Sequence, residues 1–123
     1  MSEPKAAASV ILLRPSSGPE PEIYLLRRHR KASFMSSSFV FPGGIADEGE
    51  EDPKVTAVRE LFEESGVLLA QAPGSQDERD QWRKRLNIDK EDFGSIVDPA
   101  SLRVDEMQYY AHWVTPSIEK RRY

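Results

Sequence analysis

The residues of this chain with the clearest chemical potential are three glutamates on one short segment. Glu60, Glu63 and Glu64 are three and four positions apart, so on an α-helix they share one face. Carboxylates that lie so close repel one another and raise each other's pKa unless a cation lies between them. A hard divalent ion, Mg²⁺ or Mn²⁺, prefers such oxygen ligands. The pattern predicts a divalent-metal site, and an acidic helix face exposed only to solvent is the alternative.

The segment that carries these glutamates is predicted to be a helix from Pro53 to Ser65. Asp52 is a suitable N-cap, Pro53 fits the first helical position, and Gly66 is expected to end the helix in the left-handed conformation. The apolar residues lie on the opposite side from the glutamates and are Val55, Ala57, Val58, Leu61 and Phe62. The helix is therefore expected to bury one side in a core and present the acidic side to a ligand.

A short apolar strand and a pair of glycines precede this helix. Residues 39–41 read as a strand, and Pro42, Gly43 and Gly44 are expected to end it in a turn. Glycine permits positive φ and a close approach of backbone to a ligand. An acidic loop then leads into the helix and contains Asp47, Glu48, Glu50 and Glu51. Backbone and carboxylates in this order suit a cluster of cations that holds a diphosphate.

These motifs resemble the signature of the Nudix hydrolase family. Residues 59–67, RELFEESGV, match the second half of the family box at every position. In the first half, five residues separate Gly44 from Glu50 as the box requires, but eight residues instead of seven precede Arg59. If Glu51 is aligned instead, the second gap is correct and the first is one too long. We interpret the loop as carrying a one-residue insertion, and either Glu50 or Glu51 fills the early position.

The resemblance implies a role for each residue of the box. The implied metal ligands are the Gly44 carbonyl, Glu60, Glu63 and Glu64. Either Glu60 or Glu64 is implied to orient or deprotonate the attacking water. Arg59 is implied to pair with Glu50 or Glu51 and to pin the loop to the helix, which is a structural role.

The resemblance also implies a fold and a reaction. The expected fold is α+β, a Nudix-type α/β/α sandwich with a mixed sheet. The expected reaction is divalent-metal-dependent hydrolysis of a nucleoside diphosphate linked to another group, with Mg²⁺ or Mn²⁺ as cofactor. Residues 25–28, 40–44 and 112–116 resemble the branch that includes coenzyme A diphosphatases. Coenzyme A or acyl-CoA is the first expected substrate, followed by ADP-ribose and dinucleotides; a catalytically inactive binding or regulatory module is the alternative.

Two apolar runs near the N-terminus, residues 10–13 and 23–26, read as strands buried on both faces. Arg27 and Arg28 follow the second run, and we weigh two interpretations of them. They form a basic rim that binds an anionic substrate, or they are the solvated end of a strand.

Residues 71–105 are predicted to be a helical insert. One helix is expected from Asp77 to about Leu86 and a second from Lys90 to Val97, either packed on the domain or covering the substrate as a lid. Residues 109–114 read as a strand, with His112 as a packing residue.

Length and composition limit the remaining possibilities. The 123 residues allow one domain, and the net charge of −4 gives no support for nucleic-acid binding. There is no cysteine, and the apolar run near the N-terminus is too short for a signal core or a membrane span. We expect a cytoplasmic protein without a membrane partner. Domains of the resembling branch continue beyond Tyr123, so the Nudix domain is expected to be incomplete: truncated, cleaved, or completed by a second protomer in a homodimer.

Overall fold

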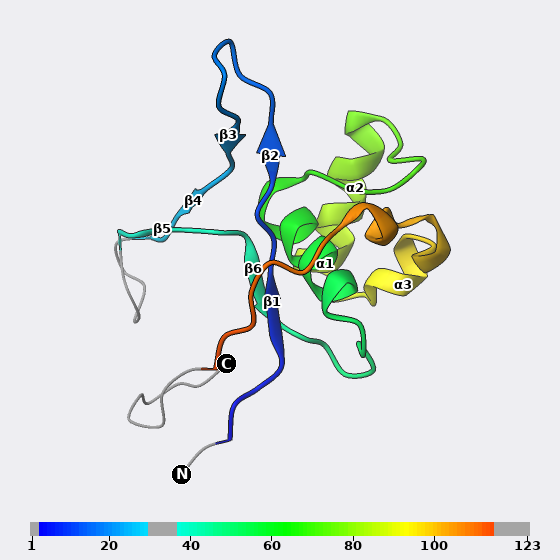
Figure 1. The fold of residues 1–123 in the computed structure, drawn as a ribbon. Helices are drawn as coiled ribbons and strands as arrows, with labels where there is room; N and C mark the ends of the chain where they lie inside the picture. The colour runs from blue at the N-terminus through cyan, green and yellow to red at the C-terminus, as the bar shows by residue number, and fades with distance from the viewer. Residues whose placement is uncertain (1–2, 30–36, 115–123) are drawn as a thin grey trace.

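The computed structural model describes residues 3–29 and 37–114, and its central element is the helix α1, Pro53–Ser65 (Figure 1). The predicted bounds and caps of this helix are confirmed. The Asp52 side chain accepts a hydrogen bond from the Lys54 backbone N–H, and Pro53 occupies the first turn. Gly66 has φ of 80° and donates its N–H to the Phe62 carbonyl. These local signals satisfy the free backbone groups at both helix ends.

The strands are short and pair only with one antiparallel neighbour each within the described residues. Strand β1 pairs with β6, β2 with β3, and β4 with β5. Their bounds are β1 Ala7–Ser9, β2 Leu13–Arg14, β3 Glu22–Ile23, β4 Leu26–Arg27, β5 Phe39–Val40 and β6 Gly43–Ile45. The α+β class is confirmed, but three small antiparallel ladders stand where one mixed sheet was expected.

The helical segment begins at α2, Gln76–Asn87, and not at Asp77. Ser75 is its N-cap, because the Ser75 side chain accepts from Glu78 N–H while the Glu78 side chain accepts from Ser75 N–H. This capping box satisfies two backbone donors at once, which a cap at Asp77 would not. The segment continues with α3, Phe93–Ile96, and the 3₁₀ turns η1, Pro99–Ser101, and η2, Val104–Glu106.

Helix α1 lies between the β1–β6 ladder and the segment that contains α2 and α3 (Figure 1). On the ladder side, Ala57 and Leu61 pack with Val10. On the helical side, Val58 and Phe62 pack in a larger cluster with Leu68, Ala70, Leu86, Phe93, Val97 and Leu102. The prediction that the insert packs on the domain is confirmed for these residues. With both apolar sides buried, α1 is held firmly and its acidic side stays free of the core.

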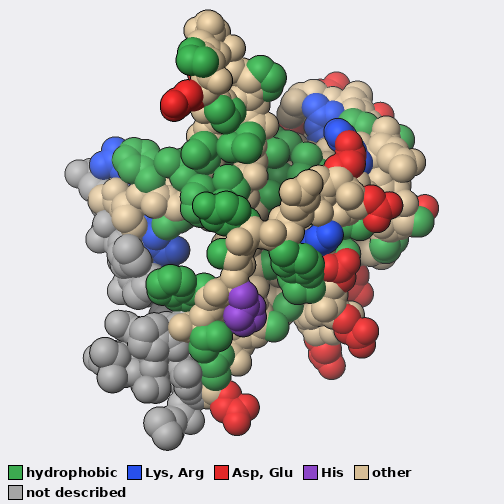
Figure 2. Space-filling view, viewed as in Figure 1, with side chains coloured by type: hydrophobic (Ala, Val, Ile, Leu, Met, Phe, Trp, Pro, Cys, Tyr) green, Lys and Arg blue, Asp and Glu red, His purple; other side chains and the backbone are tan. Residues whose placement is uncertain are grey.

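Several expectations about the strands are wrong. Leu13 and Ile23, expected to be buried on both faces, are 54 % and 51 % exposed. Apolar side chains gather on the surface over β2 to β5 (Figure 2), and among them are Leu25, Phe39 and Phe41. In the described part of the chain, nothing packs over this surface densely enough to bury it, so apolar composition alone overpredicted burial.

The region beyond η2 also differs from expectation. Residues 109–114 form no strand, and His112 is exposed and not packed. Tyr110 and Trp113 are 87 % and 80 % exposed. None of the described helices has the length and apolar character needed to cross a membrane.

Candidate metal and catalytic site

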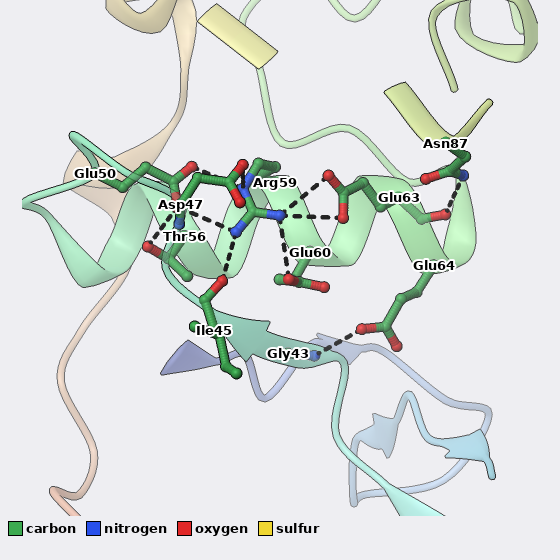
Figure 3. A network of polar contacts seen from close by, with 10 residues as sticks. All are labelled: Gly43, Ile45, Asp47, Glu50, Thr56, Arg59, Glu60, Glu63, Glu64 and Asn87. Atoms are coloured by element: carbon green, nitrogen blue, oxygen red, sulfur yellow. Dashed lines mark hydrogen bonds and ion pairs between the residues drawn. The ribbon is translucent and has the colours of Figure 1, made fainter. Parts of the chain in front are cut away.

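Arg59 is the centre of the polar network on α1 (Figure 3). Its side chain is only 3 % exposed, and its Nε lies 2.7 Å from Glu50 Oε2. Its Nη1 lies 3.0 Å from Glu63 Oε1 and 3.1 Å from Glu60 Oε1. Its Nη2 donates to the Ile45 carbonyl at 2.8 Å. Burial of Arg59 favours its neutral form, but the carboxylates of Glu50 and Glu63 more than compensate and raise the pKa of Arg59 above its ordinary value. One cation therefore ties the acidic loop, strand β6 and α1 together.

Of Glu50 and Glu51, Glu50 is the one that contacts Arg59. Its Oε1 also accepts from the Thr56 hydroxyl at 2.9 Å and from the Asp47 backbone N–H at 3.0 Å. Burial favours the neutral form of Glu50, but hydrogen bonds from Arg59, Asp47 and Thr56 outweigh it and hold its pKa below the ordinary value. Glu51 is exposed. The pairing with Arg59 that the resemblance implies for Glu50 or Glu51 is therefore made by Glu50 in this structure.

Thr56 and Asp47 are part of this network; the sequence pointed to Asp47 only as one residue of the acidic loop and did not point to Thr56. Thr56 is buried, and it lies on the same side of α1 as Arg59 because the two residues are three positions apart. That spacing is the signal that could have identified it. Asp47 also forms an ion pair with Arg59 Nε at 3.2 Å, but its side chain is 64 % exposed.

Gly43 and Gly44 lie in strand β6 and do not form the expected turn. Among the described residues, neither has a positive φ. They are needed for space instead. A Cβ on Gly43 would lie 2.5 Å from the Ala8 carbonyl, and a Cβ on Gly44 would lie 2.5 Å from Glu60 Oε1. The strand thereby passes directly beside the acidic side of α1, which is the close approach that the glycines allow.

Two of the three glutamates, Glu60 and Glu64, meet this strand from α1. The Glu60 carboxylate lies against Gly44, and Glu64 Oε1 accepts from the Gly43 N–H at 3.3 Å (Figure 3). Glu63 lies against Arg59, and its own carbonyl accepts from Arg83 Nη2 and Asn87 Nδ2. Glu60 and Glu64 therefore lie against the glycine strand, while the Glu63 carboxylate is paired with Arg59.

Burial raises the pKa of Glu60, Glu63 and Glu64 above the ordinary value, since their charges lose contact with water. Arg59 partly offsets this effect for Glu60 and Glu63, and the Gly43 N–H does so for Glu64. The charges of neighbouring carboxylates act in the same direction as burial on each of the three. The acidic side of α1 is short of positive charge even with Arg59 in place.

A ready-made ion site is not present. Within residues 3–29 and 37–114, no three acidic, histidine or cysteine side chains converge closely enough to hold a metal ion as they stand. Arg59 Nη1 lies between Glu60 and Glu63 and donates to Glu60 Oε1 and to both carboxylate oxygens of Glu63. The three side chains nevertheless fit a hard divalent cation, because carboxylate oxygens are the ligands that such an ion prefers. A bound cation would also lower the raised pKa values of these three carboxyl groups.

The two arginines of the expected basic rim are placed differently. Arg27 is exposed at the end of β4. Arg28, the next residue, is half-buried, and its charge lowers the pKa of Glu64, so its guanidinium lies near that carboxylate. Of the two, Arg28 is thus the one directed towards the acidic side of α1.

The glycine pair offers a test by matched substitutions. In Gly44→Ala the new methyl group meets the end of the Glu60 side chain, which can rotate away, so the melting temperature should change little while the carboxylate is displaced. In Gly43→Ala the methyl group meets Ala8 backbone, which cannot move without opening the β1–β6 ladder. We therefore expect a clear drop in melting temperature only for Gly43→Ala. Equal melting of the two variants contradicts this geometry.

The pKa shifts predict how stability depends on pH without metal. In the interval from the ordinary pKa of 4.5 up to the raised pKa of Glu60, the folded protein binds more protons than the unfolded one. The contribution of Glu60 to stability is therefore present at low pH and lost as pH rises through its folded pKa. In EDTA, Glu60→Gln should melt progressively higher than wild type as pH rises from 4.5. The pKa of Glu50 is lowered in the folded protein, so its charged form stabilises the fold above the ordinary pKa. Glu50→Gln should therefore melt at a lower temperature than wild type at neutral pH.

Comparison with known proteins supports the same interpretation. "Putative nudix hydrolase 7" of Caenorhabditis elegans is 28 % identical over 127 residues, which cover 97 % of this chain and 41 % of that protein. "Nudix hydrolase 15, mitochondrial" of Arabidopsis thaliana is 37 % identical over 65 residues, or 53 % of this chain and 23 % of that protein. The chain thus spans less than half the length of either relative, and no solved structure matches it significantly. The model of the NUDIX domain family matches residues 3–117, nearly the whole chain, and the chain therefore belongs to the Nudix family.

Proposed function

We propose that this protein is a divalent-metal-dependent hydrolase that cleaves the pyrophosphate bond of a nucleoside diphosphate linked to another group. The observation that carries the proposal is the meeting of Glu60 and Glu64 with the glycine strand β6, with Glu63 beside them on α1, in a member of the Nudix family. The side chains of Glu60 and Glu63 are only 15 % and 23 % exposed and are held by Arg59, and the more exposed Glu64 accepts from the Gly43 N–H. A solvated helix face would not need strand backbone against it.

The metal would be held by Glu60, Glu63 and Glu64, with Mg²⁺ or Mn²⁺ as the ion. Bound there, it would neutralise diphosphate charge and lower the pKa of a coordinated water. Gly44 remains a proposed carbonyl ligand. In an antiparallel ladder every second residue pair is hydrogen-bonded. The pairs Val10–Pro42 and Ala6–Ala46 are hydrogen-bonded, so the pair midway between them, Ala8–Gly44, is expected to be hydrogen-bonded too, with the Gly44 carbonyl directed towards Ala8 of β1. A metal at Gly44 would share that oxygen with the ladder.

The remaining roles fall to this chain's own side chains. Glu64 is our first choice to orient or deprotonate the attacking water, with Glu60 second, since only Glu64 is without a contact to Arg59 in the described network. Arg28 lies near Glu64 and would bind the diphosphate of the substrate, with Arg27 at the outer edge. Arg59 and Glu50 would be structural, holding the loop against α1.

Coenzyme A or acyl-CoA is the first substrate to test, followed by ADP-ribose and dinucleotides. The experiment incubates the protein with each of these diphosphates and Mg²⁺ or Mn²⁺, and follows the phosphorus signals by ³¹P NMR. Cleavage should convert the diphosphate signals into those of two phosphate monoesters and should stop when EDTA is added. Binding without turnover supports the inactive binding module instead, and neither binding nor turnover overturns both. A cytoplasmic location remains a separate prediction, to be checked by imaging the tagged protein.

A homodimer is a further part of the proposal. The apolar side chains on the surface over β2 to β5 include Leu13 at 54 % exposure and Phe39 at 66 % (Figure 2). Contiguous exposed apolar surface of this kind is typical of an interface. Light scattering coupled to size exclusion should give a mass of twice 14.0 kDa, and Phe39→Ser should shift it to the monomer. A monomeric wild type would contradict this part alone.

A further inference from the structure

A pocket of about 400 Å³ lies where the C-terminal end of α1 meets α2. Residues 65–68 form one wall, Pro73 closes a side, and α2 contributes Gln76, Arg79 and Arg83. The volume is within the range of about 300–1,000 Å³ that small-molecule sites occupy. None of the three metal-site glutamates lines this pocket. It is therefore a separate candidate site, not an extension of the acidic one.

The charge of the pocket is opposite to that of the chain. Two arginines line it, and no aspartate or glutamate does, whereas the whole chain has a net charge of −4. Among the described residues, the other paired guanidiniums, those of Arg14, Arg59, Arg85 and Arg103, each meet a carboxylate. Arg79 and Arg83 form none of the ion pairs found in this part of the structure and donate only to neutral oxygens. Their positive charge is thus available to an anion.

Arg83 is held in position for such a role. Its Nη2 donates to the Glu63 carbonyl at 2.9 Å, and its side chain packs beside Gly66, where an added Cβ would lie 3.4 Å from Cδ and Nη1. Its Nε is buried and has no hydrogen-bond partner in the described structure. One edge of the guanidinium is therefore anchored to α1, while its remaining hydrogen-bonding capacity is unused.

We propose that this pocket binds a phosphate monoester, with its phosphoryl dianion between Arg79 and Arg83. Two planar guanidinium groups match a dianion in charge and can each donate two parallel hydrogen bonds to phosphate oxygens. The organic part of the ligand lies against the apolar wall of Val67, Leu68 and Pro73. The pocket is many times larger than the roughly 30 Å³ of a single water, so it has room for an organic group beside the phosphoryl group.

The test measures binding in EDTA, so that its outcome does not depend on the hydrolase proposal. Adenosine 5′-monophosphate and inorganic phosphate are the two probes, followed by NMR of the arginine Nε–H signals and of the Gly66 amide. Adenosine 5′-monophosphate should shift the Arg79, Arg83 and Gly66 signals and bind at least tenfold more tightly than phosphate. Equal affinity of the two probes overturns the assignment of an ester, and unmoved signals at these residues overturn the site.

Matched variants separate the pocket from general electrostatic attraction. Arg79→Gln should weaken binding at least tenfold, because it removes a lining cation whose hydrogen bonds in the described structure go to Gly74 and Gln76 and not to α1. Lys84→Gln removes the same charge from the same helix at an exposed position outside the pocket and should leave the affinity unchanged. Equal weakening by both variants contradicts the proposal. Circular dichroism checks that each variant is folded. If Arg79→Gln is unfolded, Arg79→Lys replaces it in the test; this variant keeps the charge without the planar fork and should bind with intermediate affinity.

Discussion

Replacing Glu64 by glutamine is expected to lower metal-dependent diphosphate hydrolysis by on the order of 10²- to 10⁴-fold, the range typical of a lost general base. The amide keeps the size of the side chain and can still accept the Gly43 N–H, but it binds a cation weakly and cannot take a proton. Glu63→Gln should also cut the rate by orders of magnitude, through lost metal binding. The rate is measured with the best substrate from the ³¹P panel.

Stability distinguishes a functional role of Glu64 from a structural one. Because burial raises the pKa of Glu64, its charge does not stabilise the fold, and Glu64→Gln should melt at or slightly above the wild-type temperature. Glu51→Gln is the matched control, since it removes the same charge from an exposed position of the acidic loop. Full activity in both Glu63→Gln and Glu64→Gln would show that the site has been assigned to the wrong residues.

Arg59→Ala is expected to be the most destabilising substitution in the network. It leaves the carboxylates of Glu50, Glu60 and Glu63 without their shared cation in a site where Arg59 itself is 3 % exposed. Removing one partner of a buried ion pair costs about 3–5 kcal/mol, so both the free energy of unfolding and the activity should fall. Urea denaturation measures the first, and the hydrolysis assay the second.

Two further variants test whether Arg59 acts by pinning the loop. Arg59→Lys keeps the charge but loses the planar fork that reaches Glu50, Glu63 and the Ile45 carbonyl together, so it should be intermediate. Arg85→Ala breaks a surface pair with Glu91 and should change stability little. An Arg59→Ala protein that unfolds at the wild-type urea concentration would rule out the pinning role.

Local sequence signals were sufficient to predict α1 but not the sheet. Asp52, Pro53 and Gly66 act through backbone groups within a few residues, so the helix ends follow from the chain itself. The strands near Leu13 and Ile23 depend on what covers them, which composition does not reveal. Burial in a sheet is a tertiary property, and the apolar run predicted it wrongly.

The site was predictable in its residues more than in its contacts. The spacing of Glu60, Glu63 and Glu64 indicated a shared face, and the structure brings that face to Gly43 and Gly44. The glycines were expected in a turn, because their need for space beside Ala8 and Glu60 arises only after the elements pack. The choice between Glu50 and Glu51 likewise depended on the path of the loop, which the box spacing left open.

Binding of Mn²⁺ to the wild type and to Glu64→Gln, followed by electron paramagnetic resonance of the free ion, tests most directly whether a cation belongs among these carboxylates. The wild type should remove Mn²⁺ from solution with one or more sites, and both Glu63→Gln and Glu64→Gln should weaken that binding at least tenfold while Glu51→Gln leaves it unchanged. Wild-type protein that leaves all Mn²⁺ free, or glutamine variants that bind it as well as the wild type, would contradict a metal site on α1.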